Sequence, residues 1–212
     1  SQFPSNALNR NDILSTWAGV RPVIGAEKSK DPSKERRDHA VWSDNGLITV
    51  SGGKLTTFRL IALDALAAAK DNLPQAKKIS DDRVFLTPRI TAQSLSPENT
   101  SWAQRLLGRY GEKAIEVVNE SSLDERHNLY ETEFSLAECR WAIKYEAVEH
   151  LDDLLLRRTR LGMCLPNGGA NLYPAIKELF LSNQNWDDER WQKEVIRYET
   201  IWKKYYSLPS HA

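Results

Sequence analysis

Cysteine is scarce in this 212-residue sequence and the net charge is zero, and each of these two features argues against a class of protein. The two cysteines, Cys139 and Cys164, form no CxxC pair, so the sequence predicts neither a disulfide framework nor a zinc site, and a reducing, cytoplasmic setting is the default. Lys plus Arg equals Asp plus Glu at 29 each, which argues against a general nucleic-acid-binding protein. A zero total charge still permits a local cationic pocket.

Long apolar runs are also missing. No stretch approaches the ~18 apolar residues that a membrane-spanning helix needs, and the first residues show no signal-peptide pattern. The only methionine is Met163 and the sequence opens at Ser1, so we expect the chain to be a piece of a longer protein.

A hairpin and a helix are predicted before residue 74. The apolar runs Ala40–Trp42 and Leu47–Val50 flank Asp44-Asn45-Gly46, which predicts an antiparallel hairpin because Asn and Gly tolerate positive φ. Apolar residues then recur at helical spacing up to Leu73, after the good N-cap residues Thr56 and Thr57.

Helical spacing dominates the C-terminal half of the sequence. A longer predicted stretch is made of Leu136–Tyr145 and Val148–Leu161, with a break near His150-Leu151-Asp152. The last two predicted helices cover residues 171–181 and 187–206.

We therefore predict an α+β fold, in which a small antiparallel β region precedes an all-α C-terminal domain. The predicted domain bounds are 1–78 for the strands, the glycine turn and the returning helix, 79–99 for a linker, and 100–212 for the helical domain. Pro88 and Pro97 interrupt the periodicity of the linker.

The turn Gly52-Gly53-Lys54 follows the second strand of the hairpin. It is not a nucleotide-binding P-loop, since Ile48 stands where the first glycine is needed and Leu55 where serine or threonine must follow the lysine. What remains is a strand, a glycine turn, a lysine and a helix start, where free amides and the helix dipole face any anion beyond the turn. Spacing alone favours an ordinary turn with a solvated lysine.

Two arginines upstream complete a cationic set with Lys54. Arg21 lies between Val20 and Pro22 in an apolar stretch, where a buried arginine needs a partner anion. Arg37 lies in a charged loop, a setting typical of a solvated residue. The three cations and the paired glycines would suit a small anion and a flat cofactor whose charge changes.

Other charged motifs give weaker signals. The run Arg157-Arg158-Thr159-Arg160 follows three leucines, and its cations complement a helix dipole, an explanation that we favour over an anion site. The histidines show no metal-ligand spacing, and no Ser/His/Asp or Cys/His arrangement can be argued; they are His39, His127, His150 and His211.

Four ordered blocks carry a family resemblance. They are Trp17–Pro22, Arg37-Asp38-His39, Ser51–Arg59 and Asp152–Gly162. In order and approximate spacing, the sequence resembles the FAD-dependent glycerol-3-phosphate dehydrogenases, over nearly its whole length.

The resemblance implies oxidation of sn-glycerol 3-phosphate to dihydroxyacetone phosphate, with FAD reduced and electrons passed to a membrane quinone. It implies catalytic roles for Arg21 and Lys54, and substrate binding by Arg21, Arg37 and Lys54. It also implies that the flavin ring lies against Gly53, Lys54, Leu55 and Thr56. The full-length protein would lie on the inner surface of the cytoplasmic membrane as a peripheral protein, and a homodimer is left open.

The sequence departs from the family pattern at Arg36 and Phe58, neither of which is a proposed ligand. No GxGxxG motif follows a strand, so the segment that would bind most of FAD is absent and we expect the isolated chain to be inactive. Two alternatives stay open: an oxidase that passes electrons to oxygen, and a non-catalytic interaction module formed by the helices of residues 100–206.

Overall fold

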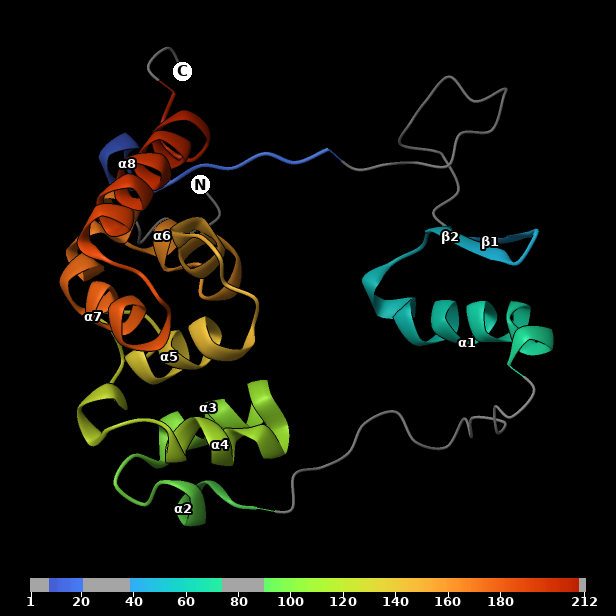
Figure 1. Cartoon of the computed structure of the whole chain (residues 1–212), viewed down its shortest axis with the longest axis horizontal. Coiled ribbons are helices and arrows are strands. Elements are labelled where there is room, and N and C mark those ends of the chain that lie inside the picture. The colour runs from blue at the N-terminus through green and yellow to red at the C-terminus, as the bar shows by residue number, and fades with distance from the viewer. Residues whose placement is uncertain (1–7, 21–38, 74–89, 210–212) are drawn as a thin grey trace. The chain divides into compact units, whose positions relative to one another are not determined.

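The computed structural model describes residues 8–20, 39–73 and 90–209 (Figure 1). The chain divides into two compact units, one formed by Ser1–Ala18 with Thr87–Ala212 and the other by Gly19–Leu86. The first unit is helical and the second carries a two-stranded antiparallel sheet, so the predicted α+β fold class is confirmed.

The smaller unit is built on the predicted hairpin. Strands β1 (His39–Asp44) and β2 (Leu47–Gly52) pair antiparallel, with Asp44 opposite Leu47. The turn residues Asn45 and Gly46 have φ values of 47° and 86°, as a two-residue hairpin turn with a right-handed strand twist requires. The hairpin prediction is therefore confirmed.

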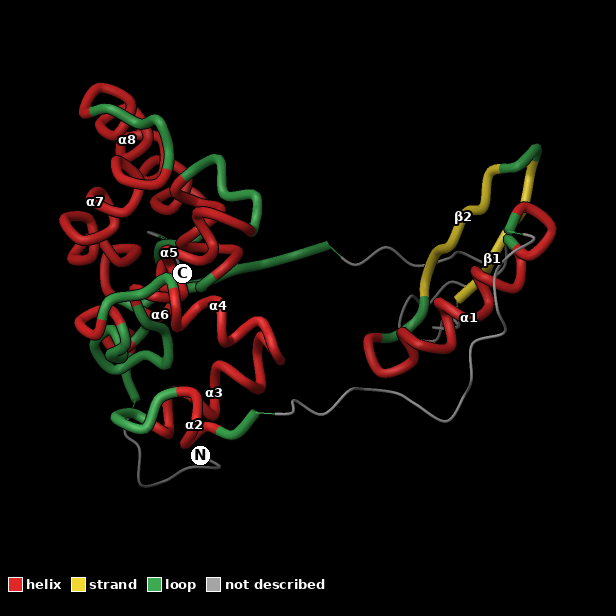
Figure 2. Tube along the Cα trace, turned by 60° about the horizontal axis from the view of Figure 1, so that its bottom comes forward, coloured by secondary structure: helices red, strands yellow, loops and turns green. Residues whose placement is uncertain are grey.

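Helix α1 (Phe58–Ala68) runs back alongside both strands (Figure 2). None of the described residues of this unit is buried. Several large apolar side chains are half or more exposed, among them Leu47 at 68%, Leu55 at 89% and Phe58 at 50%. A hairpin with one helix does not enclose a core of its own.

The larger unit contains the remaining helices. They are α2 (Ala92–Leu95), α3 (Thr100–Tyr110), α4 (Ala114–Asn119), α5 (Leu136–Tyr145), α6 (Leu161–Cys164), α7 (Tyr173–Asn183) and α8 (Asp188–Tyr205). The prediction for α8 is confirmed to within one residue at each end, because Asp187 is its N-cap and accepts a hydrogen bond from the amide of Arg190.

Two stretches differ from the sequence prediction. The segment predicted over Leu136–Tyr145 is confirmed as α5, but the segment predicted from Val148 becomes helical only at Leu151, after Ala147 adopts a φ of 51°. The chain then continues into a π-helical turn, Asp153–Arg158. The short helix α2 lies within the predicted linker, and its Leu95 packs against a buried cluster.

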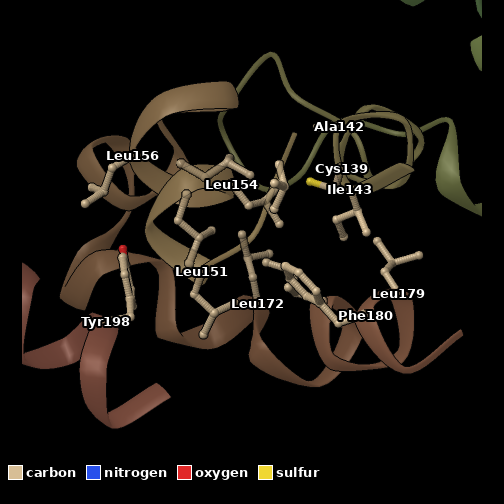
Figure 3. Close-up of a cluster of buried hydrophobic side chains, with 14 of the residues drawn as sticks. Cys139, Ala142, Ile143, Leu151, Leu154, Leu156, Leu172, Leu179, Phe180 and Tyr198 are labelled. Atoms are coloured by element: carbon tan, nitrogen blue, oxygen red, sulfur yellow. The ribbon is translucent and has the colours of Figure 1, made fainter. Parts of the chain in front are cut away.

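Buried side chains form two clusters that meet at α5. The first lies between α5, the π-helical turn, α7 and α8, and includes Leu151, Leu154, Phe180 and Tyr198 (Figure 3). The second lies between α3, α4 and α5, and includes Trp102, Leu106, Val117 and Trp141. Helix α5 serves both, because Cys139, Ala142 and Ile143 belong to the first cluster whereas Ala137 and Trp141 belong to the second.

A buried carboxylate joins α3 to α5. Glu138 is fully buried and accepts hydrogen bonds from both terminal nitrogens of Arg105, one of them at 2.8 Å. The amide and the hydroxyl of Ser135 each donate to Glu138 Oε2 at 3.0 Å, and Trp102 Nε1 donates to the Ser135 hydroxyl at 3.0 Å. Every oxygen of this buried acid therefore has a partner.

The described N-terminal residues pack on the end of α8. The Ser15 hydroxyl donates to the carbonyl of Met163 at 2.8 Å, and the Thr16 amide donates to the carbonyl of Tyr206 at 2.8 Å. The Thr16 hydroxyl donates to the carbonyl of Ser207 at 3.0 Å. By sequence order this segment was grouped with residues 1–78, but its partners lie about 150–190 residues away and leave no local pattern.

Replacing Gly162 by Ala tests the packing of the first cluster. A Cβ at this position would overlap the hydroxyl of buried Tyr198 and lie 3.2 Å from the carbonyl oxygen of Leu155. We expect Gly162→Ala to lower the free energy of unfolding by about 1–3 kcal/mol, as overpacking does. Urea unfolding followed by circular dichroism measures the change.

The matched control is Gly108→Ala, in the last turn of α3, where a Cβ would meet nothing within 4 Å. It should raise the free energy of unfolding by about 0.5–1 kcal/mol, since alanine is the better helix former. Equal stabilities for the two variants would contradict the packing described around Gly162.

Candidate functional site

The candidate site is the turn that leaves β2 and enters α1. Gly52 and Gly53 have φ values of 78° and 89°, a conformation that side chains other than glycine rarely adopt. A short 3₁₀ helix, Leu55–Thr57, follows and continues directly into α1. The predicted order of strand, glycine turn, lysine and helix start is confirmed.

Gly53 is held between the first strand and α1. A Cβ at this position would overlap the side chain of Ile61 and lie 3.3 Å from the Cβ of His39. His39 Nε2 lies 2.6 Å from a carboxylate oxygen of Asp64, which ties β1 to α1 beside the turn. The backbone of the turn is therefore fixed by contacts on both sides.

Lys54 sits at the helix start with its side chain exposed. Its carbonyl accepts hydrogen bonds from the amide and the hydroxyl of Thr57, both at 3.0 Å, and its amide lies 3.3 Å from the same hydroxyl. In the described part of the chain, no acidic side chain forms an ion pair with Lys54. Its ammonium group is thus available to an external anion.

The next two amides, of Leu55 and Thr56, open the helix and have no acceptor within it. Leu55 is 89% exposed beside them. One turn therefore carries amides, a cation and an apolar side chain. The amides and the cation suit the edge of a flat ring that gains negative charge, and the apolar side chain suits its face. Over residues 8–20, 39–73 and 90–209, no three His, Cys, Asp or Glu side chains gather as metal ligands would.

Arg21 and Arg37 lie outside the described residues. Their predicted meeting with Lys54 in one pocket, and the predicted contact of Gly53, Lys54, Leu55 and Thr56 with a flavin, stay predictions.

The block Asp152–Gly162 has a structural role that sequence reasoning only partly anticipated. Asp152 is buried and accepts hydrogen bonds from Arg157 and from Arg197 of α8. The Thr159 amide and hydroxyl donate to the carbonyl of Leu154, at 3.0 and 2.7 Å, and close the π-helical turn. Arg157 is therefore held by carboxylates, rather than by a helix dipole alone.

The arginines decide the charge of Asp152. Burial works to raise the pKa of this carboxyl, but hydrogen bonds and charges from Arg157 and Arg197 outweigh it and hold the pKa below the usual value. Arg197 could not be predicted as a partner of Asp152, because it lies 45 residues away in the sequence and no local spacing marks the pair.

No helix among the described residues has the length and apolar character needed to cross a membrane.

Comparisons with known proteins agree on one family. Residues 76–191 match the model described as the C-terminal domain of alpha-glycerophosphate oxidase. The chain is 31% identical over 205 residues to the mitochondrial glycerol-3-phosphate dehydrogenases of Bos taurus and Homo sapiens, covering 89% of this chain and 28% of each relative. It is 30% identical over 209 residues to glycerol-3-phosphate dehydrogenase 2 of Mycobacterium tuberculosis, covering 90% of this chain and 35% of the relative. The chain thus spans about a third of the length of these relatives.

Replacing Gly53 by Ala tests the turn. Both Gly53→Ala and Gly46→Ala carry the cost of a positive φ, about 1–2 kcal/mol. Only at position 53 would the added Cβ atom also meet Ile61 and His39. We therefore expect Gly53→Ala to open the hairpin more often than Gly46→Ala does. Amide hydrogen exchange over β1 and β2 measures the opening. Adding Ile61→Val to Gly53→Ala removes the overlapping Cδ1 atom and should recover part of the protection against exchange. Equal exchange rates in Gly53→Ala and Gly46→Ala would contradict the packing described around Gly53.

Replacing Asp152 by Asn tests the buried ion pairs. Because folding lowers the pKa of Asp152, its charge stabilises the fold above the unfolded pKa of about 3.9, and this stabilisation is lost as the pH falls through the lowered value. Asp152→Asn should cost about 1–3 kcal/mol of unfolding free energy at pH 7. The difference from the parent chain should shrink as the pH falls below about 4.

Urea unfolding across this pH range measures both effects. The control is Asp124→Asn, at an exposed position, which should change the unfolding free energy little at either pH. A cost for Asp152→Asn that does not change with pH would contradict the assignment.

Proposed function

Since the chain belongs to the glycerol-3-phosphate oxidase and dehydrogenase family, we propose that it forms the C-terminal part of a flavoenzyme that oxidises sn-glycerol 3-phosphate to dihydroxyacetone phosphate. The family resemblance predicted from the sequence is confirmed by the match over residues 76–191. The reaction and its cofactor are our proposal, because the chain spans only 28–35% of the length of the relatives named above.

The observation that carries the proposal is the turn at Gly52-Gly53. It presents the Lys54 ammonium and the amides of Leu55 and Thr56 on one exposed helix start, without a carboxylate partner for Lys54 among the described residues. Such a start attracts negative charge. A phosphorylated substrate supplies such negative charge, and so does a flavin ring that becomes anionic.

FAD, held beside the glycine turn, would supply the two-electron acceptor that oxidation of the substrate's secondary alcohol requires. In this proposal Gly53, Leu55 and Thr56 lie against the flavin ring with their main chain, and Lys54 stabilises negative charge that develops between ring and substrate. The exposed leucine keeps water from that side of the ring.

Arg21 and Arg37 are proposed to bind the phosphate of the substrate, with Arg21 also acting in catalysis. A guanidinium donates two parallel hydrogen bonds to neighbouring phosphate oxygens, which a lysine cannot do. Lys54 then contributes a single point charge from the turn.

Quinone is the electron acceptor that we propose, with the full-length protein bound peripherally to the inner surface of the membrane. The description of the matched family model names an oxidase, and this supports oxygen as the alternative electron acceptor. Hydrogen peroxide produced during turnover of the longer protein would indicate oxygen, and its absence together with quinone reduction would indicate quinone.

The Lys54 proposal is tested in the longer protein that contains this chain. We expect Lys54→Ala to lower kcat/KM for glycerol 3-phosphate by roughly ten- to a hundredfold, as loss of a charged hydrogen bond of about 1.5–3 kcal/mol does. Reduction of a dye acceptor measures the rate.

Lys70→Ala is the matched control, because Lys70 is an exposed lysine of the same unit that follows α1. It should leave kcat/KM unchanged. If Lys54→Ala behaved in the same way, the glycine turn would have no part in the reaction, and the alternative of a non-catalytic helical module would gain support. The 212-residue chain alone should show no dye reduction with added FAD.

A further inference from the structure

A groove of about 850 Å³ lies on the helical unit, beside the end of α8, and none of its lining residues belongs to the glycine turn. Its walls include Trp17, Arg157, Arg160, Arg197, Lys204 and Tyr205. The volume is within the range of small-molecule sites, about 300–1,000 Å³. Four of these six side chains are cationic, whereas Asp152 is the one acidic residue in the lining.

Two of the cations are positioned by carboxylates. Arg157 and Arg197 both donate to buried Asp152, and each uses the same terminal nitrogen for its further contact, with Asp153 at 3.0 Å and with Glu194 at 3.9 Å. A guanidinium has five N–H donors, so each arginine keeps donors that these contacts do not occupy. Asp152 thus holds two arginines in place without using up their hydrogen-bonding capacity.

The other two cations have no carboxylate partner among the residues that the structure describes. Arg160 adopts a φ of 56°, between the π-helical turn and α6, and its side chain lines the groove. Lys204 Nζ lies 4.9 Å from the centre of the Tyr205 ring. Asp152, Asp153 and Glu194 carry three negative charges beside the two positive charges of Arg157 and Arg197. Arg160 and Lys204 add two more positive charges, so these seven groups together keep one positive charge for a ligand.

Two aromatic side chains stand beside these cations. Trp17 is 75% exposed and Tyr205 is 59% exposed, which is unusual for such large rings. The segment that carries Trp17 is fixed by the hydrogen bonds of Ser15 and Thr16 to the ends of α6 and α8. A second hollow of about 630 Å³ shares Trp17, Ala18, Lys204 and Tyr205 with the first, so the depression is extended.

We propose that this groove binds a phosphate monoester that carries a planar ring, a chemistry of which a nucleoside monophosphate is the simplest representative. Arg160 and Lys204 donate to the phosphate oxygens, and the free donors of Arg157 and Arg197 supply further hydrogen bonds. Trp17 and Tyr205 stack on the ring. This site does not depend on the function proposed for the glycine turn.

The probe is AMP, added to the 212-residue chain and followed by isothermal titration calorimetry and tryptophan fluorescence. Inorganic phosphate and adenosine, each carrying one half of the probe, should both bind more weakly than AMP. Binding should weaken as salt is added, because screening reduces the attraction between exposed charges.

The variants are chosen so that the fold survives. Arg160→Gly keeps a backbone conformation that glycine adopts without strain, and it removes the cation. Arg160→Gly, Lys204→Gln and Trp17→Ala should each weaken AMP binding roughly tenfold or more. Arg160→Lys should retain part of the affinity.

Lys193→Gln is the matched control, because Lys193 lies on the same helix as Lys204, pairs with Glu189 and does not line the groove. It should bind AMP as the parent does. Equal AMP affinity in the parent and in Arg160→Gly and Lys204→Gln, or binding of inorganic phosphate as tight as that of AMP, would overturn the proposal. Absence of AMP binding together with sedimentation on phosphatidylglycerol but not phosphatidylcholine vesicles would assign the groove to lipid headgroups instead.

Discussion

The buried carboxylate of Glu138 is the contact on which the helical unit depends. It accepts hydrogen bonds from Arg105 of α3 and from Ser135 at the start of α5, so it fixes one end of α5. Because α5 contributes side chains to both hydrophobic clusters, this single constraint sets the position of both. A buried charge that lost such a partner would cost about 3–5 kcal/mol, so the three residues act together.

The segment after α5 serves the core and the surface at once. Leu154 and Leu155 are fully buried in the first cluster, while Arg157 and Arg160 line the groove. The π-helical turn allows the leucines to face the core while the arginines face the groove. Its wider hydrogen-bonded ring brings residues five apart together, so Arg157 reaches Asp152. The positions of Arg157 and Arg160 thus depend on the packing of the leucines that precede them in the chain.

Local patterns were enough to predict the hairpin, the glycine turn and α8, because each has its signal within a few residues: Asn45-Gly46, Gly52-Gly53 and the Asp187 cap. Contacts between distant residues left no such signal. Ser15 forms a hydrogen bond with Met163 and Thr16 with Ser207, both distant in the sequence. The π-helical turn was also missed, since its periodicity is close to that of an α-helix and only the bonds of Thr159 to Leu154 reveal it.

The glycine turn poses a different physical constraint. Its backbone is fixed by His39 and Ile61, yet none of the described residues of its unit is buried, and Leu55 and Phe58 expose large apolar surfaces beside Lys54. An ammonium in open water attracts a phosphate only weakly, because the surrounding solvent screens it. A catalytic role for Lys54 therefore requires further walls that exclude water. The matched relatives, about three times as long as this chain, have the length to supply them.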